Sequence, residues 1–211
     1  MPTNSHHSSA LALRFEIIKR LSPGFRHRML GRMQPISLLS HLMGKKIQSG
    51  QTEPEFLLKR LQELKESLNS ATDATVDLFS WLTPDDHSLQ ALNAVVEECL
   101  DLLKMDIYTS NVSFENTIDS KALIKVSKLR HVLAACLLTF IDITDKATKV
   151  TLSAELVAGE LVIEMTMQPA VGESKPANGN AKFVDWDAIQ LICQGAKFSK
   201  EQERIVISNL A

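Results

Sequence analysis

The stretch PEFLLKRLQELKESLNSATDATVDLFSWL, Pro54 to Leu82, decides the fold of the first part of the chain. Its apolar and small residues recur at alternating spacings of four and three: Leu57, Leu61, Leu64, Leu68, Ala71, Thr75, Leu78 and Leu82. This heptad spacing places them on one face of an α-helix and is typical of a coiled-coil seam. Thr52 is suited to cap the start of the helix, and Pro84 ends it.

The preceding stretch carries a second seam. Its members are Leu11, Phe15, Ile18, Ser22, Phe25 and Met29, followed by Met33, Ile36, Ser40, Met43 and Ile47. Pro23 and Pro35 should disturb this helix, because proline has no amide donor and crowds the preceding turn. The two helices, joined by a polar turn at residues 45–52, form a hairpin. One hairpin cannot bury two apolar seams, so we expect a homodimer in which two hairpins form a four-helix bundle.

After Pro84 the hydrophobic pattern predicts helices interleaved with strands. We expect helices at residues 89–107, 121–143 and 185–196, strands at 112–118 and 204–210, and a β-hairpin at 149–168 that turns near Ala158 and Gly159. The fold class is therefore α+β, with a long helical hairpin followed by a small α/β domain. The predicted domains are residues 8–83 and 88–211.

Composition excludes several classes of function. The net charge is −2 over 211 residues, so the chain as a whole is not a nucleic-acid binder. The longest apolar run, residues 132–138, is far shorter than the roughly 20 residues that a membrane helix needs. The first ten residues lack the pattern of a secretory signal. Three separated cysteines, Cys99, Cys136 and Cys193, indicate buried thiols in a reducing cytoplasm rather than a disulfide framework or a zinc site.

One histidine stands in an unusual setting. His27 lies midway between the seam residues Phe25 and Met29, so it should point to solvent, and Gly31 one turn later leaves bare backbone beside it. Residues 17–52 hold no acidic residue and seven basic ones: Lys19, Arg20, Arg26, Arg28, Arg32, Lys45 and Lys46. Such a field attracts phosphate or clustered carboxylates. The alternative is that His27 is an ordinary solvated histidine. A metal site is not indicated, because no second metal-ligating residue lies three or four positions after His27.

The residues around His27 resemble a known motif. HRMLGRMQPISLL, residues 27–39, is similar to the phosphoacceptor box of sensor histidine kinases, and LRHVLAACLLTFID, residues 129–142, resembles their nucleotide-binding helix. The box matches at His27, Arg28, Gln34, Ile36, Ser37 and Leu39, and departs at Leu30, Gly31 and Arg32.

The resemblance also shows where the nucleotide site has changed. The two asparagines of the family fall at Ala135 and Thr139, and the family's Asp-x-Gly-x-Gly is replaced by MQPAVG at residues 167–172. The second glycine box falls near residues 185–192, which contain no glycine. A Mg-ATP site needs oxygen ligands and backbone donors. We therefore expect a degenerate ATPase-like α/β sandwich, no bound ATP and no ATP-dependent kinase activity.

The whole pattern looks like that of dimeric histidine phosphotransferases with a degenerate ATPase-like domain, which serve two-component signalling. The resemblance implies that His27 takes a phosphoryl group from one response-regulator receiver aspartate and passes it to another. It implies receiver docking by Arg20, Arg26, Arg28, Gly31 and Arg32, with Mg²⁺ supplied by the receiver and no cofactor held by this chain. The alternatives are a catalytically silent dimeric scaffold, or pseudokinase, and an unorthodox but active ATP site.

Overall fold

The computed structural model describes residues 3–50, 53–83, 89–119, 122–157, 160–170, 189, 192, 197–201 and 204–208. The chain divides into two compact units. The hairpin unit comprises residues 22–83, and the sheet unit comprises residues 1–21 together with 84–211. Residues 8–21, which the sequence assigns to the hairpin domain, thus group with the sheet unit.

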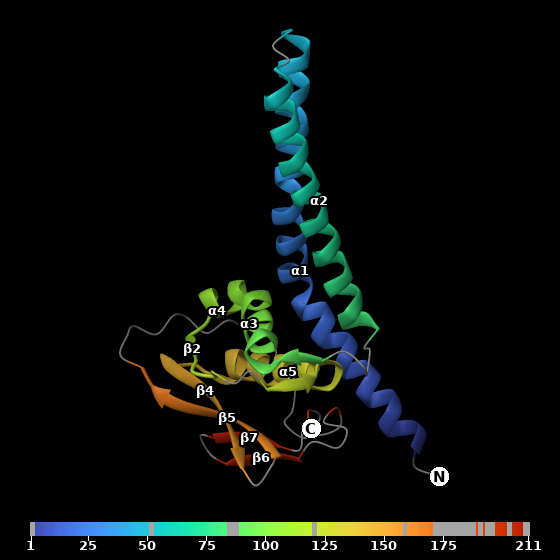
Figure 1. Cartoon of the computed structure of the whole chain (residues 1–211). Helices are drawn as coiled ribbons and strands as arrows, with labels where there is room; N and C mark the ends of the chain where they lie inside the picture. Colours follow the sequence, from blue (N-terminus) through green and yellow to red (C-terminus); the bar gives the residue numbers. More distant parts are fainter. Residues whose placement is uncertain are drawn as a thin grey trace. The chain divides into compact units, whose positions relative to one another are not determined.

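The hairpin unit contains most of α1 (Thr3–Gln48) and all of α2 (Pro54–Leu82), which lie side by side (Figure 1). Gly50 between them has a φ of 71°, a left-handed conformation that glycine adopts without strain. Pro54 begins α2, whereas the predicted cap Thr52 lies outside the described residues. The predicted disturbance by Pro23 and Pro35 does not end α1, because each proline removes only one hydrogen bond from a helix of 46 residues.

An aromatic pair closes one end of the hairpin. The rings of Phe25 and Trp81 are 5.7 Å apart between centroids and inclined by 73°, an edge-to-face contact. Both side chains are buried. Such pairs add about 0.5–1.5 kcal/mol beyond the area they bury. Leu39, Ala71 and Ala74 extend the buried strip between the two helices.

Much of each predicted seam stays uncovered within one chain. The exposed large apolar side chains of the hairpin unit are Leu30, Met33, Leu38, Leu42, Ile47, Leu58, Leu61, Leu68, Val76, Phe79 and Leu82. Five of them, Met33, Ile47, Leu61, Leu68 and Leu82, are predicted seam residues. A single hairpin therefore leaves a large apolar surface in water.

The first part of α1 buries a different face from the one predicted. Ala10, Leu13, Ile17 and Leu21 are buried, whereas the predicted seam residues Leu11 and Phe15 are more than half exposed. The spacing of the buried set, three then four then four, is also helical. Both stripes satisfy the periodicity, so only packing within the sheet unit distinguishes them.

The sheet unit interleaves strands and helices. Its elements are β1 (Leu89–Ala91), α3 (Leu92–Leu102), α4 (Lys104–Thr109), β2 (Val112–Asn116), β3 (Leu123–Lys125), α5 (Val126–Ile143), β4 (Thr148–Val157), β5 (Glu160–Pro169), β6 (Lys197–Glu201) and β7 (Arg204–Ser208). The main sheet has the order β2-β4-β5-β7-β6; β2 and β4 are parallel and the other pairs antiparallel. Strands β1 and β3 form a separate antiparallel pair.

Most predicted elements of the second half are confirmed. The predicted helix at 89–107 is instead β1, α3 and α4, and the first residues of the predicted helix at 121–143 form β3. Strand β6 was not predicted. Of the predicted helix at 185–196 only residues 189 and 192 are described, and both are helical and buried.

The core of the sheet unit lies between α5 and one face of the sheet. All residues from Leu129 to Ile141 are buried. Val150, Leu152, Ile163 and Met165 are buried, while the intervening strand residues are more exposed, as alternation across a two-layer sandwich requires. The fold class α+β, with a helical hairpin followed by an α/β sandwich, is confirmed.

Candidate functional site

His27 is presented to solvent by the residues that flank it. Phe25 is buried against Trp81, and the hydroxyl of Thr75 on α2 contacts the Met29 sulfur at 3.8 Å. These two contacts turn the seam side of α1 toward α2. His27, midway between them, is therefore exposed, in agreement with the heptad prediction.

Gly31 opens the backbone one turn beyond His27. A Cβ atom added at Gly31 would meet no atom within 4 Å. Its carbonyl also lacks the usual donor, because residue 35, four positions later, is proline. Gln34 and Leu38 continue the same stripe and are exposed. We call the stripe of His27, Gly31, Gln34 and Leu38 the His27 face.

Three of the predicted docking arginines flank this face in the hairpin unit. Arg26 and Arg32 are exposed and Arg28 is half-buried. Arg32 lies on the side of α1 toward α2, where its Nη1 donates to Ser70 Oγ at 2.9 Å. The positive charge near His27 is therefore spread around both edges of the His27 face.

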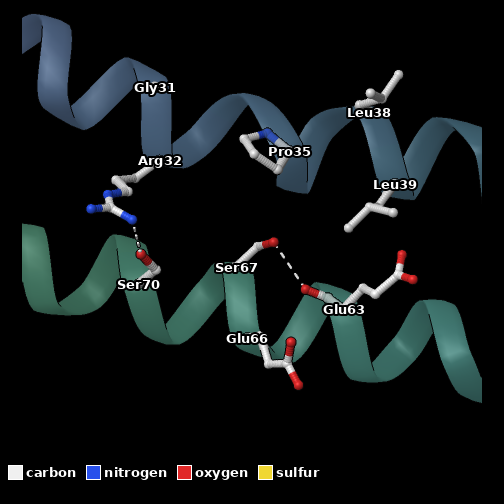
Figure 2. Close-up of a pocket in the computed structure, with 9 residues that line it drawn as sticks. All are labelled: Gly31, Arg32, Pro35, Leu38, Leu39, Glu63, Glu66, Ser67 and Ser70. Carbon is white, nitrogen blue, oxygen red and sulfur yellow. Dashed lines mark hydrogen bonds between the residues drawn. The ribbon is translucent and has the colours of Figure 1, made fainter.

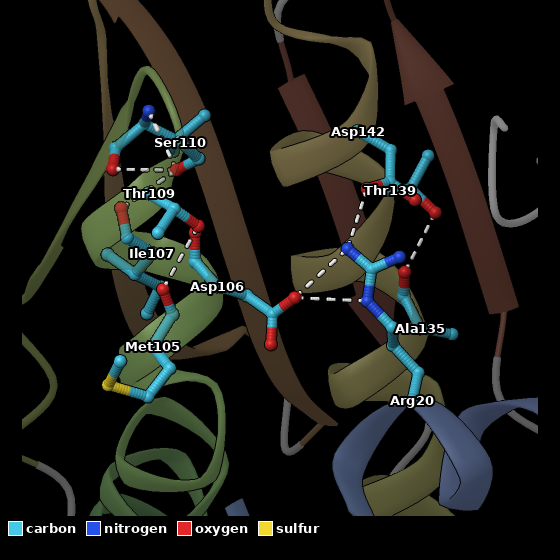
Figure 3. Close-up of polar contacts among 10 residues, drawn as sticks. Arg20, Met105, Asp106, Ile107, Thr109, Ser110, Ala135, Thr139 and Asp142 are labelled. Carbon is cyan, nitrogen blue, oxygen red and sulfur yellow. Dashed lines mark hydrogen bonds and ion pairs between the residues drawn. The ribbon is translucent and has the colours of Figure 1, made fainter. Parts of the chain in front are cut away.

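Arg20 is placed differently from the other predicted docking residues. It belongs to the sheet unit, where its guanidinium contacts Asp106 Oδ1 at 3.0 Å and Asp142 Oδ1 at 3.1 Å (Figure 3). Asp106 lies on α4 and Asp142 on α5. The docking role of Arg20 stays a prediction, but its guanidinium is already paired with two carboxylates.

A pocket of about 490 Å³ lies between α1 and α2 next to the His27 face (Figure 2). Gly31, Arg32 and Pro35 line it from α1, and Ser67 and Ser70 line it from α2. Small side chains on both helices leave this space open. The pocket sits beside the candidate acceptor rather than at the tip of the hairpin.

The opposite end of the pocket is acidic. Glu63 and Glu66 line it from α2. Each already has a partner one turn away on the same helix, because Arg60 pairs with Glu63 and Gln62 donates to Glu66 at 2.8 Å. The Arg32 end therefore carries the positive charge of the pocket.

In α5, which resembles a nucleotide-binding helix, the two positions that differ from the family are shielded from solvent. Ala135 and Thr139 are buried, and the Thr139 hydroxyl donates to the Ala135 carbonyl at 2.8 Å (Figure 3). Both positions therefore face the protein interior. Of the residues at the two lost glycine boxes, 171–172, 185–188 and 190–191 lie outside the described residues.

Sequence reasoning missed Ser70 and the pair of Asp106 and Asp142. A signal for Asp142 was present, because an acid near the end of the apolar helix 126–143 requires a buried cation as partner. Ser67 and Ser70 interrupt the leucine pattern of α2 as two small polar residues three positions apart. Nothing in that spacing indicates which side chain they would contact on α1.

The described part of the chain shows neither a metal site nor a membrane-spanning helix. No three His, Cys, Asp or Glu side chains in that part of the chain are grouped so that they could hold a metal ion. In the same part of the chain, no helix has the length and apolar character needed to span a bilayer. Cys99 and Cys136 are buried and form no disulfide; Cys193 is outside the described residues.

Comparison with known proteins gives structural likeness only. No protein-family model matches the chain, and no curated protein sequence matches it.

The solved structures it is similar to include the Acinetobacter baumannii histidine kinase AdeS, with 16% identity over 85% of this chain and 95% of that chain and a TM-score of 0.42. The histidine kinase ThkA, in a crystal structure with the response regulator protein TrrA, shows 15% identity over 98% of this chain and 66% of that chain, with a TM-score of 0.43. A bacterial phosphotransferase shows 10% identity over 92% of this chain and 95% of that chain, with a TM-score of 0.39. Histidine kinases are also the family whose motifs the sequence resembles.

Proposed function

We propose that this chain is a histidine phosphotransfer protein of two-component signalling that relays a phosphoryl group between receiver-domain aspartates through His27. The observation that carries the proposal is the His27 face: an exposed imidazole one turn from an open glycine, on a helix stretch with arginines and no acid. A relay needs an accessible nucleophile and space for the partner's backbone. Phosphoryl transfer depends mainly on positioning and charge stabilisation, so little further machinery is required.

The chemical step is a reversible displacement at phosphorus. The lone pair of one imidazole nitrogen of His27 forms a P–N bond while the P–O bond to the receiver aspartate breaks. The aspartate carboxylate leaves with the electron pair of that bond, and the proton on the second imidazole nitrogen passes to water. In the second step, the carboxylate of another receiver attacks phosphorus, the P–N bond breaks, and the imidazole recovers a proton.

The receiver, which supplies its own Mg²⁺ and acidic residues, docks on the His27 face. Leu30 and Leu38 are more than half exposed and offer apolar contact next to His27. Arg26, Arg28 and Arg32 border that contact and attract the acidic rim of a receiver. Arg20 is left out of this proposed docking surface because it is paired with Asp106 and Asp142.

The second domain is proposed to bind no ATP and to support no kinase activity. The burial of Ala135 and the internal hydrogen bond of Thr139 support this proposal, because neither position offers an oxygen ligand to a cation at the surface. The chain would then receive its phosphoryl group only from a phosphorylated receiver domain. Its activity would be that of a phosphorelay intermediate.

A homodimer is proposed because one hairpin leaves much of both seams uncovered. Charge favours a second copy: residues 22–50 hold five basic residues and no acidic one, namely Arg26, Arg28, Arg32, Lys45 and Lys46. Helix α2 holds five acidic residues, Glu55, Glu63, Glu66, Asp73 and Asp77, against three basic ones. In a four-helix bundle each α1 can lie beside an α2 of both chains, so this asymmetry is complementary.

The test is phosphate transfer from a panel of receiver domains that carry labelled phosphate on their aspartates. We expect acid-labile, alkali-stable label on the wild type, none on His27→Ala, and wild-type labelling of His41→Ala. His41 is the matched control because it is exposed on the same helix. Labelling of His27→Ala would contradict the assignment of His27, and labelling by Mg-ATP alone would contradict the proposed degenerate domain.

The second candidate is a dimeric scaffold that binds a receiver or kinase without accepting phosphate. The exposed apolar Leu30 favours it, because it serves docking without taking part in chemistry. Binding of a receiver with no label on His27 from any member of the panel would establish the scaffold and exclude the relay.

A further inference from the structure

Arg32 differs from an ordinary exposed arginine in that α2 holds it. Its Nη1 donates to Ser70 Oγ at 2.9 Å, across 38 residues of chain (Figure 2). Arginine has many rotamers, and a partner that binds it must pay for their loss. A side chain that is already held loses less freedom on binding.

The place where Arg32 is held lies at the edge of the His27 face. Arg32 directly follows Gly31, whose open Cβ position leaves room for a partner's backbone. Arg32, Gly31 and Ser70 also line the same pocket. A group that approaches Gly31 therefore meets the guanidinium at a defined position.

We propose that Ser70 is a positioning residue that holds the Arg32 guanidinium for a carboxylate of the docked receiver. The contact with Ser70 uses one of five N–H donors, so the remaining four are available for a bidentate pair with a carboxylate. The inference rests on the proposed function for its partner, an acidic receiver domain, and adds a determinant of how that partner is recognised.

Ser67 is a matched control within the same pocket. It lines the pocket as Ser70 does, but its hydroxyl donates to the Glu63 carbonyl at 2.9 Å on its own helix. Ser67→Ala therefore removes the same atom from the same cavity without touching Arg32. Ser70→Thr keeps the hydroxyl and should keep the contact.

The experiment measures, on the full-length chain, the Kd for a receiver by titration calorimetry and the rate of transfer to His27 at saturating receiver. We expect Ser70→Ala to raise Kd about three- to ten-fold, which corresponds to loss of one hydrogen bond, with no change in the saturated rate. Ser70→Thr and Ser67→Ala should match the wild type. In an Arg32→Ala background, Ser70→Ala should have no further effect, because the residue acts through Arg32.

The positioning role of Ser70 would be overturned if Ser70→Ala left the Kd unchanged. It would also be overturned if Ser70→Ala raised the Kd equally in the wild-type and the Arg32→Ala backgrounds. If the wild type still transfers phosphate, that result would overturn only the role of Ser70 and not the proposed relay. Binding without transfer in the wild type would overturn the relay, while the Kd values would still decide the role of Ser70. Circular dichroism melts of each variant exclude a loss of fold as the cause.

Discussion

Arg20 joins two helices of the sheet unit through one guanidinium. Its Nε and Nη2 both lie 3.0 Å from Asp106 Oδ1, and Nη2 lies 3.1 Å from Asp142 Oδ1. The Asp142 side chain is only 2% exposed, so it depends on a cation inside the protein. The first part of α1 is thereby a structural part of the sheet unit.

Replacement of Arg20 by methionine should destabilise the chain by about 2–4 kcal/mol, because it removes the arginine that pairs with the buried Asp142 carboxylate. The double variant Arg20→Met, Asp142→Asn should recover part of that loss. Urea unfolding followed by circular dichroism measures both. Lys19→Met is the matched control, because its pair with Glu16 is exposed; it should change stability by less than about 0.5 kcal/mol. Equal losses for the Arg20 and Lys19 variants would contradict the structural role of Arg20.

Replacement of Gly31 by alanine should separate stability from docking. The added methyl group meets no atom of this chain within 4 Å, and alanine favours a helix over glycine by about 1 kcal/mol. The melting temperature should therefore rise, while the Kd for a receiver should rise as well, since the methyl group fills the approach to His27. Gly44→Ala on the same helix also adds a methyl group in open space and should stabilise the chain without weakening binding. Unimpaired binding by Gly31→Ala would remove Gly31 from the docking surface.

A charge placed in the uncovered seam should disrupt the proposed dimer. Leu68 is 56% exposed in one chain, although it is a seam residue of α2. In a four-helix bundle, Leu68→Glu would bury an unpaired carboxylate, so we expect the dimer dissociation constant to increase roughly 100-fold or more. Sedimentation velocity at several concentrations measures this. Asn69→Glu adds the same charge at the adjacent exposed position outside the seam and should leave the dimer intact. A dimer unaffected by Leu68→Glu would mean that the seam is not the interface.

Mg-ATP should not stabilise the protein. A ligand that binds the native state raises the free energy of unfolding by RT ln(1 + [L]/Kd), so millimolar nucleotide would reveal even weak binding as a higher melting temperature. We expect a shift of less than about 1 °C, equal to that caused by magnesium phosphate at the same ionic strength. A rise of several degrees with Mg-ATP only would show that the sheet unit retains a nucleotide site.

Local patterns were sufficient for much of the fold and for the placement of His27. The β-hairpin at β4 and β5 follows from strict alternation: β4 ends at Val157 and β5 begins at Glu160, and the predicted turn at Ala158 and Gly159 lies outside the described residues. The exposure of His27 follows from its position between Phe25 and Met29. Each of these predictions rests on residues only a few positions apart in the sequence, because helix and strand periodicity are properties of consecutive residues.

Tertiary structure decided what periodicity leaves open. The first part of α1 has two stripes of helical spacing, one through Leu11 and Phe15 and one through Leu13 and Ile17, and only the second is buried. Arg20 was predicted for docking, yet its contacts lie 86 and 122 residues away along the chain, on α4 and α5. The contact of Arg32 with Ser70 spans 38 residues and depends on the register of the two hairpin helices.

The sequence by itself determined the helical hairpin, the strand pairing of β4 and β5 and the outward position of His27. Only the tertiary structure decided that Arg20 pairs with Asp106 and Asp142 and that Arg32 contacts Ser70. The physical reason is that backbone hydrogen bonding and side-chain periodicity act between near neighbours in the chain. Ion pairs and side-chain hydrogen bonds between elements depend on packing that brings distant residues within about 3 Å.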